Sequence, residues 1–389
     1  MKILIYTHAF APQVGGLQRI VMSLATGLAR LQTGNGSSAP EVTVVTPTPA
    51  HGSDGDAFPF RVVRQPRLGR LLRLLLESDV VHLAGPALLP LVLAWILHRR
   101  VVVEHHGFQT VCPNGQLMHE PSQTFCTGHF MAEKHLECLR CNANRGGFAS
   151  FRMWLLTFPR RRLCQLIAAN ISPTAWLAGV LQLPRTTTVL HGLQLPAQNQ
   201  FVSRPASPAT FIFVGRLVGT KGVGVLLAAA QKLKAQGHVF RVKIIGDGPD
   251  RESLQAQSRS SGLDGCVEFL GRMADDRMEE VLAGATAVVM PSLAGEVFGL
   301  VAAESMLRGR PVIASDIGAL REVVGEDGLL FEPGDETGLM VHMRQLLENT
   351  IQAAELGRQA LQRAMELFSE ERMVQQHFSL YGELLSCDQ

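Results

Sequence analysis

Residues Glu296 to Glu304 read EVFGLVAAE and come three residues after an apolar run, AVVMPS, that ends at Ser292. The apolar run predicts a buried strand, and VAAESML predicts a helix that stops at the Gly-Arg-Pro sequence of residues 309–311. The backbone N–H groups around Gly299 would then be unpaired at a helix N-terminus, where the positive end of the helix dipole lies. This strand, turn and helix therefore predict an anion site of the kind that binds a phosphate.

The same alternation of strand and helix continues along the chain. Its 389 residues are 46% hydrophobic and 18% charged, which supplies sizeable cores and excludes general disorder. We predict an α/β protein with two doubly wound parallel sheets. The predicted divisions are a first domain at 1–195, a linker rich in Pro, Gln, Ser and Ala at 196–209, a second domain at 210–367 and a C-terminal helical segment at 368–389.

Charged side chains flank the predicted anion site on both sides. Glu296 precedes it and Glu304 lies about one turn into the helix, so a ligand with central phosphates would meet a carboxylate at each end. A nucleotide sugar has this layout, and carboxylates accept hydrogen bonds from sugar hydroxyls. The segment FIFVGRLVGTKG adds Arg216 and Lys221, whose charges would stabilise a departing diphosphate without a divalent metal.

Nearly the whole chain resembles the retaining glycosyltransferases of family 4, which have the GT-B fold of two Rossmann-like domains facing a central cleft. One departure is HGLQ at residues 191–194, where many members have Asn-Gly-Val-Asp. The motifs that carry the resemblance are MKILIYTHAFAPQVGGLQRIV at 1–21, VVHLAGP at 80–86, VVVEHHG at 101–107, VGRLVGTKG at 214–222, IIGDGP at 244–249, EFLGR at 268–272, the pair E-x7-E, and RPVIASDIGALREVV at 310–324 followed by GLLFEPGD.

The resemblance implies transfer of a hexose, with retention and without a catalytic metal, from a nucleoside-diphosphate sugar to an acceptor hydroxyl. The expected catalytic residues are Glu296, which would contact the donor sugar near the reacting carbon, and His106, which would lie near the donor hexose and the acceptor. Glu304 would bind the ribose hydroxyls. The donor-binding residues implied are Gly15, Gly16, Arg216, Lys221, Phe298, Gly299, Leu300 and Glu304.

Other interpretations of the same residues remain open. In isolation, Glu296 is equally a helix-capping acid, and His106 a hydrogen-bonded histidine at a strand end. Two other functions also fit this fold: a nucleotide-sugar epimerase, which needs no acceptor, and a non-catalytic subunit that binds a sugar nucleotide. For the nucleotide, uridine diphosphate is our first expectation and guanosine diphosphate our second.

Cysteines are concentrated in one predicted insertion, at residues 108–147. The C-x2-C spacing of two of them is typical of a zinc knuckle, and two further thiols would complete a tetrahedral structural zinc site. The alternative is a set of ordinary buried or free thiols. The four cysteines are Cys112, Cys126, Cys138 and Cys141.

Positive charge is concentrated in the first half of the chain. Residues 1–200 hold 18 basic and 9 acidic residues, a net charge of +9, whereas residues 201–389 hold 18 and 25, a net charge of −7. Five arginines recur every three residues from Arg61 to Arg73, and FRMWLLTFPRRR at 151–162 mixes aromatic residues with arginines. Such segments either bind an anionic membrane surface or form helices with a solvated basic face. We expect a glycan, lipid-linked or small-molecule acceptor, and no nucleic acid partner.

The apolar runs are too short to span a membrane. None reaches the roughly 18 residues of a spanning helix, and ALLPLVLAWIL at residues 87–97 predicts a core helix instead. The first residues predict a buried strand rather than a signal peptide. The expected location is therefore cytoplasmic, with peripheral attachment at the inner membrane face as a further hypothesis.

Overall fold

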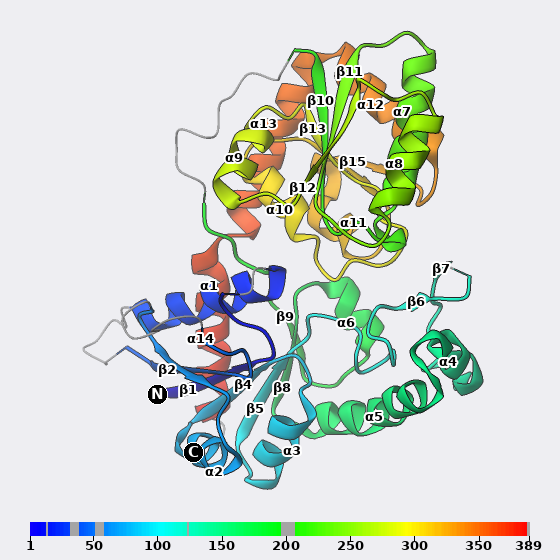
Figure 1. Ribbon diagram of the computed structural model, residues 1–389. Coiled ribbons are helices and arrows are strands. Elements are labelled where there is room, and N and C mark those ends of the chain that lie inside the picture. The colour runs from blue at the N-terminus through cyan, green and yellow to red at the C-terminus, as the bar shows by residue number, and fades with distance from the viewer. Residues whose placement is uncertain (13–14, 32–38, 51–57, 123, 196–206, 387–389) are drawn as a thin grey trace. The chain divides into compact units, whose positions relative to one another are not determined.

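The computed structural model describes residues 1–12, 15–31, 39–50, 58–122, 124–195 and 207–386 (Figure 1). The chain divides into two compact units. Unit 1 comprises residues 1–117, 126–194 and 368–389, and unit 2 comprises residues 118–125 and 195–367. Most of the predicted linker, residues 196–206, lies outside the described residues.

Unit 1 is built on a seven-stranded sheet with the order β3-β2-β1-β4-β5-β8-β9, in which all neighbouring strands are parallel. The central strands are buried, as expected for a parallel sheet covered on both faces, and this explains their continuous apolar runs. The strands are β1 (Lys2–Thr7), β2 (Glu41–Thr46), β3 (Arg61–Arg64), β4 (Val80–Ala84), β5 (Arg100–Glu104), β8 (Ala169–Ser172) and β9 (Thr186–Thr188).

Helices cover this sheet, and the last helix of the chain is one of them. Helix α14 (Glu370–Ser386) packs so closely on α1 (Gly16–Arg30) that a Cβ on Gly27 would lie 2.3 Å from a methyl group of Val374. The buried face of α14 includes His377 and Tyr381. The other helices of unit 1 are α2 (Leu68–Glu77), α3 (Leu88–Ile96), α4 (His135–Cys141), α5 (Gly147–Leu166) and α6 (Ala175–Leu181).

Helix α3 corrects the prediction of a core helix at residues 87–97. It buries Leu91 and Ala94 but leaves Leu89, Trp95 and Ile96 exposed by 58%, 45% and 55%. The apolar run is continuous around the helix, so its composition does not distinguish the buried side from the exposed one. Among the helices of the described chain, none combines the length and hydropathy needed to cross a bilayer.

Unit 2 has a six-stranded parallel sheet with the order β12-β11-β10-β13-β14-β15. Helices α7, α8 and α12 lie on one face, and α9 and α10 on the other (Figure 1). The prediction of two doubly wound parallel sheets is therefore confirmed. The strands of unit 2 are β10 (Ala209–Val214), β11 (Phe240–Ile245), β12 (Val267–Gly271), β13 (Ala287–Met290), β14 (Val312–Ser315) and β15 (Leu329–Phe331).

The remaining elements complete unit 2. The short antiparallel hairpin of β6 (Met118–His119) and β7 (Thr124–Phe125) is also grouped with it. Its helices are α7 (Val223–Ala235), α8 (Arg251–Ser260), α9 (Asp275–Ala283), α10 (Leu300–Met306), α11 (Ala319–Val324), α12 (Glu336–Glu348) and α13 (Thr350–Leu367).

Candidate functional site

The strand order of unit 2 reverses between β10 and β13. In open parallel sheets, ligands bind outside the carboxyl ends of the strands at such a reversal. The loops after these two strands are joined there, because the Leu293 amide donates to the Thr220 carbonyl at 2.8 Å. Gly222 has a φ of +65°, and a Cβ at this position would lie 1.7 Å from the Pro291 carbonyl oxygen. A glycine is therefore required for the two loops to come this close.

Lys221 and Glu296 meet at this junction. The Lys221 Nζ donates to Glu296 Oε1, and the Ser292 Oγ donates to the same oxygen at 2.9 Å. The Glu296 side chain is 15% exposed and that of Lys221 31%. Burial alone would raise the pKa of Glu296, but the Lys221 charge and the two hydrogen bonds outweigh it and lower the pKa. Glu296 is therefore a carboxylate that a cation holds in place.

The predicted strand, turn and helix are formed around the junction. Helix α10 begins at Leu300, after Gly299 with a φ of +93°, and Phe298 is 3% exposed beside it. Glu304 lies on α10 and is half-buried. Arg216, in the loop after β10, is exposed. All the site residues predicted between positions 216 and 304 thus lie in the loops after β10 and β13 or on the helix that follows β13.

The other predicted site residues lie in unit 1. Gly15 precedes α1 in an extended conformation, and its carbonyl accepts from the Arg19 amide at 3.1 Å. Gly16 is the first residue of the helix. His106 follows β5, and its side chain is 11% exposed.

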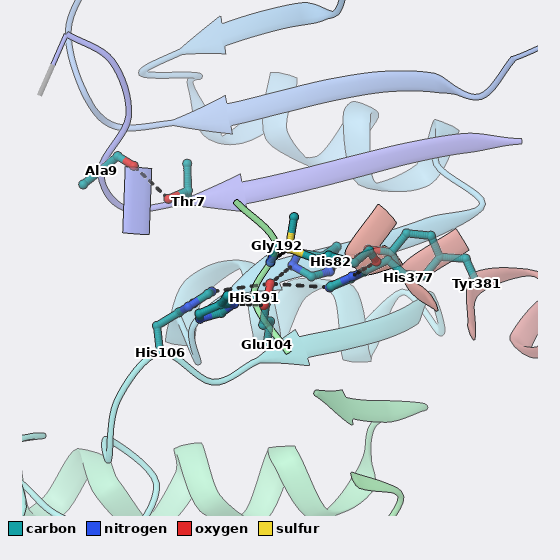
Figure 2. A network of polar contacts seen from close by, with 10 residues as sticks. Thr7, Ala9, His82, Glu104, His106, His191, Gly192, His377 and Tyr381 are labelled. Atoms are coloured by element: carbon teal, nitrogen blue, oxygen red, sulfur yellow. Dashed lines mark hydrogen bonds and ion pairs between the residues drawn. The ribbon is translucent and has the colours of Figure 1, made fainter. Parts of the chain in front are cut away.

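His106 belongs to a larger cluster that surrounds Glu104, the last residue of β5 (Figure 2). The Glu104 carboxylate is fully buried, and four histidine rings face it. Glu104 Oε2 lies 3.2 Å from His82 Nε2, 3.4 Å from His106 Nε2 and 3.7 Å from His377 Nε2. The fourth histidine, His191, places Nδ1 3.4 Å from Oε1 and stacks on His106 with ring centroids 5.1 Å apart.

Further contacts hold these rings in position. The His377 Nδ1 donates to the Met373 carbonyl at 2.8 Å, and the Tyr381 hydroxyl lies 2.8 Å from His82 Nδ1. Burial would raise the pKa of Glu104, but the His106 charge and the surrounding ring nitrogens hold the pKa well below its usual range. Glu104 is therefore a carboxylate anion in the interior of unit 1.

The four cysteines of the predicted insertion are all buried. Asn114 links two of them, because the Cys112 thiol donates to its Oδ1 at 2.9 Å and its Nδ2 donates to Cys141 Sγ at 3.6 Å. Burial and the three neighbouring sulfurs raise the pKa of Cys138 to about 12. The described residues contain two groups of three ligand atoms that all lie within 4.8 Å of one another, and both include Glu104. The thiols do not form such a group.

Sequence reasoning identified His106 but missed its neighbours. His82, Glu104, His191 and His377 come from β4, β5, the segment after β9 and α14, so no local motif contains them together. One signal was present: HGLQ stands where many members of the resembled family have Asn-Gly-Val-Asp, and its histidine is His191.

The solved structures similar to this chain establish its fold class. The structure of Anabaena Alr3699/HepE, in complex with UDP and glucose, matches with a TM-score of 0.70 and 20% identity, over 98% of this chain and 99% of that one. Sucrose-phosphate synthase from Thermosynechococcus elongatus matches with a TM-score of 0.72 and 20% identity, over 99% of each chain. The protein has the GT-B fold, which confirms the fold class expected from the sequence.

Sequence comparisons show which known proteins resemble the second half of the chain. Residues 196–363 match the family model described as glycosyl transferases group 1. D-rhamnosyltransferase WbpZ from Pseudomonas aeruginosa is 38% identical over 166 residues, which are 42% of each chain. Glycogen synthase from Mycobacterium tuberculosis is 32% identical over 184 residues, 46% of this chain and 44% of its own length. The matched regions thus span less than half the length of these curated relatives.

Proposed function

We propose that this protein is a retaining glycosyltransferase that moves a hexose from a nucleoside-diphosphate sugar to an acceptor hydroxyl without a catalytic metal. The observation that carries the proposal is the pair of Lys221 and Glu296 at the strand-order reversal of unit 2. A cation and a carboxylate stand there side by side, in the region that matches group 1 glycosyl transferases. A diphosphate and a sugar are the two chemical groups that such a pair recognises.

The contacts of this pair suggest how the donor is bound. A diphosphate at the junction would take over Lys221 from Glu296, and Arg216, which is exposed in the same loop, would supply a second charge. Ser292 would keep its hydrogen bond to Glu296, so the carboxylate would remain oriented towards the hydroxyls of the sugar. The two cations would stabilise the negative charge that grows on the leaving diphosphate. This is why the proposal needs no catalytic metal.

A uridine diphosphate sugar is our first candidate for the donor, and a guanosine diphosphate sugar the second. The structure of Alr3699/HepE similar to this chain contains UDP and glucose. Glu304 would bind the ribose hydroxyls, which are common to both nucleotides. Side chains alone therefore favour neither base, and the choice has to be measured.

Nucleotide binding and turnover together test the proposal. We expect one nucleoside diphosphate to raise the melting temperature of the wild type and of Glu252→Ala, an exposed control in unit 2, but not of Glu304→Ala. Sugar transfer should require an acceptor and continue when Mg²⁺ is omitted. Conversion of the donor without any acceptor would identify an epimerase instead, and binding without turnover a sugar-nucleotide-binding subunit.

Helix α5 supports a further proposal, that the acceptor is lipid-linked and the protein attaches to an anionic membrane surface. Four apolar side chains recur on α5 with spacings of three or four residues, so they lie on one face of the helix. Exposed arginines, Arg152 and Arg162, lie on the same helix. The exposed fractions of the apolar residues are 81% for Phe148, 48% for Phe151, 48% for Leu155 and 40% for Phe158.

Binding to vesicles of phosphatidylserine and phosphatidylcholine at low salt tests this attachment. Phe148→Ser/Phe151→Ser should release the protein from the vesicles, whereas Ile351→Ser, which is 82% exposed in unit 2, should leave binding unchanged. If the wild type does not bind these vesicles, the membrane proposal is wrong and a soluble acceptor is favoured.

We also propose that Cys112, Cys126, Cys138 and Cys141 bind a structural zinc ion. The raised pKa of Cys138 comes from burial and from its three neighbouring sulfurs, and a divalent cation would relieve both by stabilising the thiolates. Binding would have to draw the four sulfurs closer together. Metal analysis of the wild type and of Cys138→Ser/Cys141→Ser tests this: the variant should hold one zinc ion fewer per chain.

A further inference from the structure

The geometry around Glu104 points to a second metal site: we propose that His82, Glu104 and His377 bind one divalent ion of the zinc class in the interior of unit 1. These residues lie on β4, β5 and α14 respectively. Their ligand atoms all lie within 4.8 Å of one another, and all three side chains are fully buried. Figure 2 shows the two rings directed at the carboxylate from one side of the cluster.

The tautomer of His377 is the first reason for this assignment. A backbone carbonyl only accepts hydrogen bonds, so the contact with the Met373 oxygen places a proton on His377 Nδ1. The Nε2 atom of the same ring faces Glu104 Oε2, 3.7 Å away. Two electron-rich atoms facing each other in a dry interior repel unless a cation lies between them.

Hydrogen bonding inside the cluster does not satisfy these atoms. The Nε2 atoms of His82 and His377 and both carboxylate oxygens of Glu104 are buried, and none has a hydrogen-bond partner within the described chain. Buried polar atoms in folded proteins nearly always have partners. Three of these atoms, His82 Nε2, His377 Nε2 and Glu104 Oε2, lie close to one another and leave a position for a positive group between them.

The distances also fit a bound ion. Two ligands held about 2.0–2.1 Å from a tetrahedral zinc ion stand roughly 3.4 Å apart. The separations of His82 Nε2 and His377 Nε2 from Glu104 Oε2, 3.2 and 3.7 Å, lie on either side of that value. Two imidazoles and one carboxylate suit zinc or a similar transition metal, whereas Mg²⁺ and Ca²⁺ prefer all-oxygen sites.

The contacts behind the two rings are of the kind that supports metal ligands. Histidines that bind a metal usually use the second ring nitrogen for a hydrogen bond that fixes the ring. His377 does so with the Met373 carbonyl and His82 with the Tyr381 hydroxyl, both from α14. The His106 ring, which is partly exposed to solvent, lies 3.4 Å from Glu104 Oε2. An ion bound here would be structural and would fasten α14 to the sheet of unit 1.

The test uses the full chain without a histidine tag, stripped with a chelator and reloaded with Zn²⁺. We expect an ion with nitrogen and oxygen ligands at about 2.0–2.1 Å in X-ray absorption spectra, distinct from sulfur ligands at about 2.3 Å. Reloading should raise the melting temperature of unit 1 by roughly 5–10 °C. The Cys138→Ser/Cys141→Ser variant, which lacks two of the sulfur ligands, is also loaded with Co²⁺. It should still bind Co²⁺ at the histidine site, and its absorption spectrum should show no thiolate charge-transfer band.

Matched variants locate the ion. His82→Gln/His377→Gln should lose one nitrogen-bound ion per chain, and the control His98→Gln, at an exposed histidine of unit 1, should keep it. Absence of such an ion from folded wild type, or its persistence in the double variant, would overturn the assignment and leave protons as the charge that balances Glu104. Because wild type alone decides the first point, a variant that fails to fold does not prevent the test. Nucleotide binding in unit 2 is measured separately and is not affected by either outcome.

Discussion

Each unit carries a buried or half-buried glutamate at the carboxyl edge of its sheet, but the two glutamates are balanced in different ways. In unit 2, Glu296 has Lys221 and Ser292, and all three lie in loops after adjacent strands. In unit 1, Glu104 has four histidines from separate parts of the chain. A carboxylate paired with a lysine is ready to exchange its partner for a ligand. The negative charge of a carboxylate enclosed by imidazoles is balanced only by a proton or a metal ion bound to those rings.

The largest effect is expected at Glu104. Glu104→Gln keeps the size of the side chain but removes the charge that the four histidines face, so we expect unit 1 to lose about 3–5 kcal/mol of its free energy of unfolding. All three tryptophans, Trp95, Trp154 and Trp176, lie in unit 1, so denaturant unfolding followed by their fluorescence reports on this unit. Glu77→Gln, at an exposed position, is the control. A loss below about 1 kcal/mol would mean that the cluster contributes little to stability.

Lys221 should matter for activity more than for stability. Lys221→Met removes one of two cations proposed for the leaving diphosphate, and we expect kcat/KM to fall about 10²–10³-fold, a range typical for one lost electrostatic contact to the transition state. Lys234→Met, at an exposed position on α7, should retain wild-type kinetics. Equal activity in the two variants would contradict the assigned role of the Lys221 and Glu296 pair.

Substituting two glycines by alanine tests whether the loops after β10 and β13 must lie close together. Gly222 and Gly237 both have positive φ, +65° and +84°, but only a Cβ at Gly222 would meet another atom closely, whereas Gly237 has nothing within 4 Å. Both alanine variants carry the backbone strain, about 1–2 kcal/mol. Gly222→Ala should be destabilised further and bind nucleotide more weakly, because the loop after β13 must move. Calorimetric unfolding and a nucleotide titration measure the difference, and indistinguishable variants would show that the loops adapt.

The smallest effect is expected from pH at Glu296. Its pKa is lower in the folded chain than the usual value of 4.5, so its contact with Lys221 stabilises unit 2 above about pH 4.5 and is lost as the pH falls below that value. Because Lys221 is partly exposed, we expect only about 1 kcal/mol. Calorimetry of wild type and Glu296→Gln at pH 7 and pH 3.5 should show a stability difference that shrinks at the lower pH. A constant difference would mean that the carboxylate charge is not its source.

The contrast between the two glutamates also explains what could be predicted from the sequence. The residues predicted around Glu296 are close together in the chain or follow adjacent strands, so motif spacing could predict Arg216, Lys221 and Glu304 as one group, and the structure pairs Lys221 with Glu296. The partners of Glu104 are grouped only by the strand order and by α14, and an isolated histidine carries no information about either. Helix α3 shows a second limit, because its uniform apolar composition predicts burial on every side while three of its large side chains are exposed.

The position of α14 has a consequence for how the chain folds during its synthesis. The core of unit 1 includes Tyr381, which is fully buried, and the Leu193 amide donates to the Phe368 carbonyl at 2.8 Å. Unit 1 therefore lacks a supporting helix until residues 370–386, which follow unit 2 in the sequence, have left the ribosome, although its sheet is translated before unit 2. The strands and helices of unit 2 between residues 209 and 367 are contiguous and can fold before that point. The unit whose sheet is translated earlier is thus completed after the other unit.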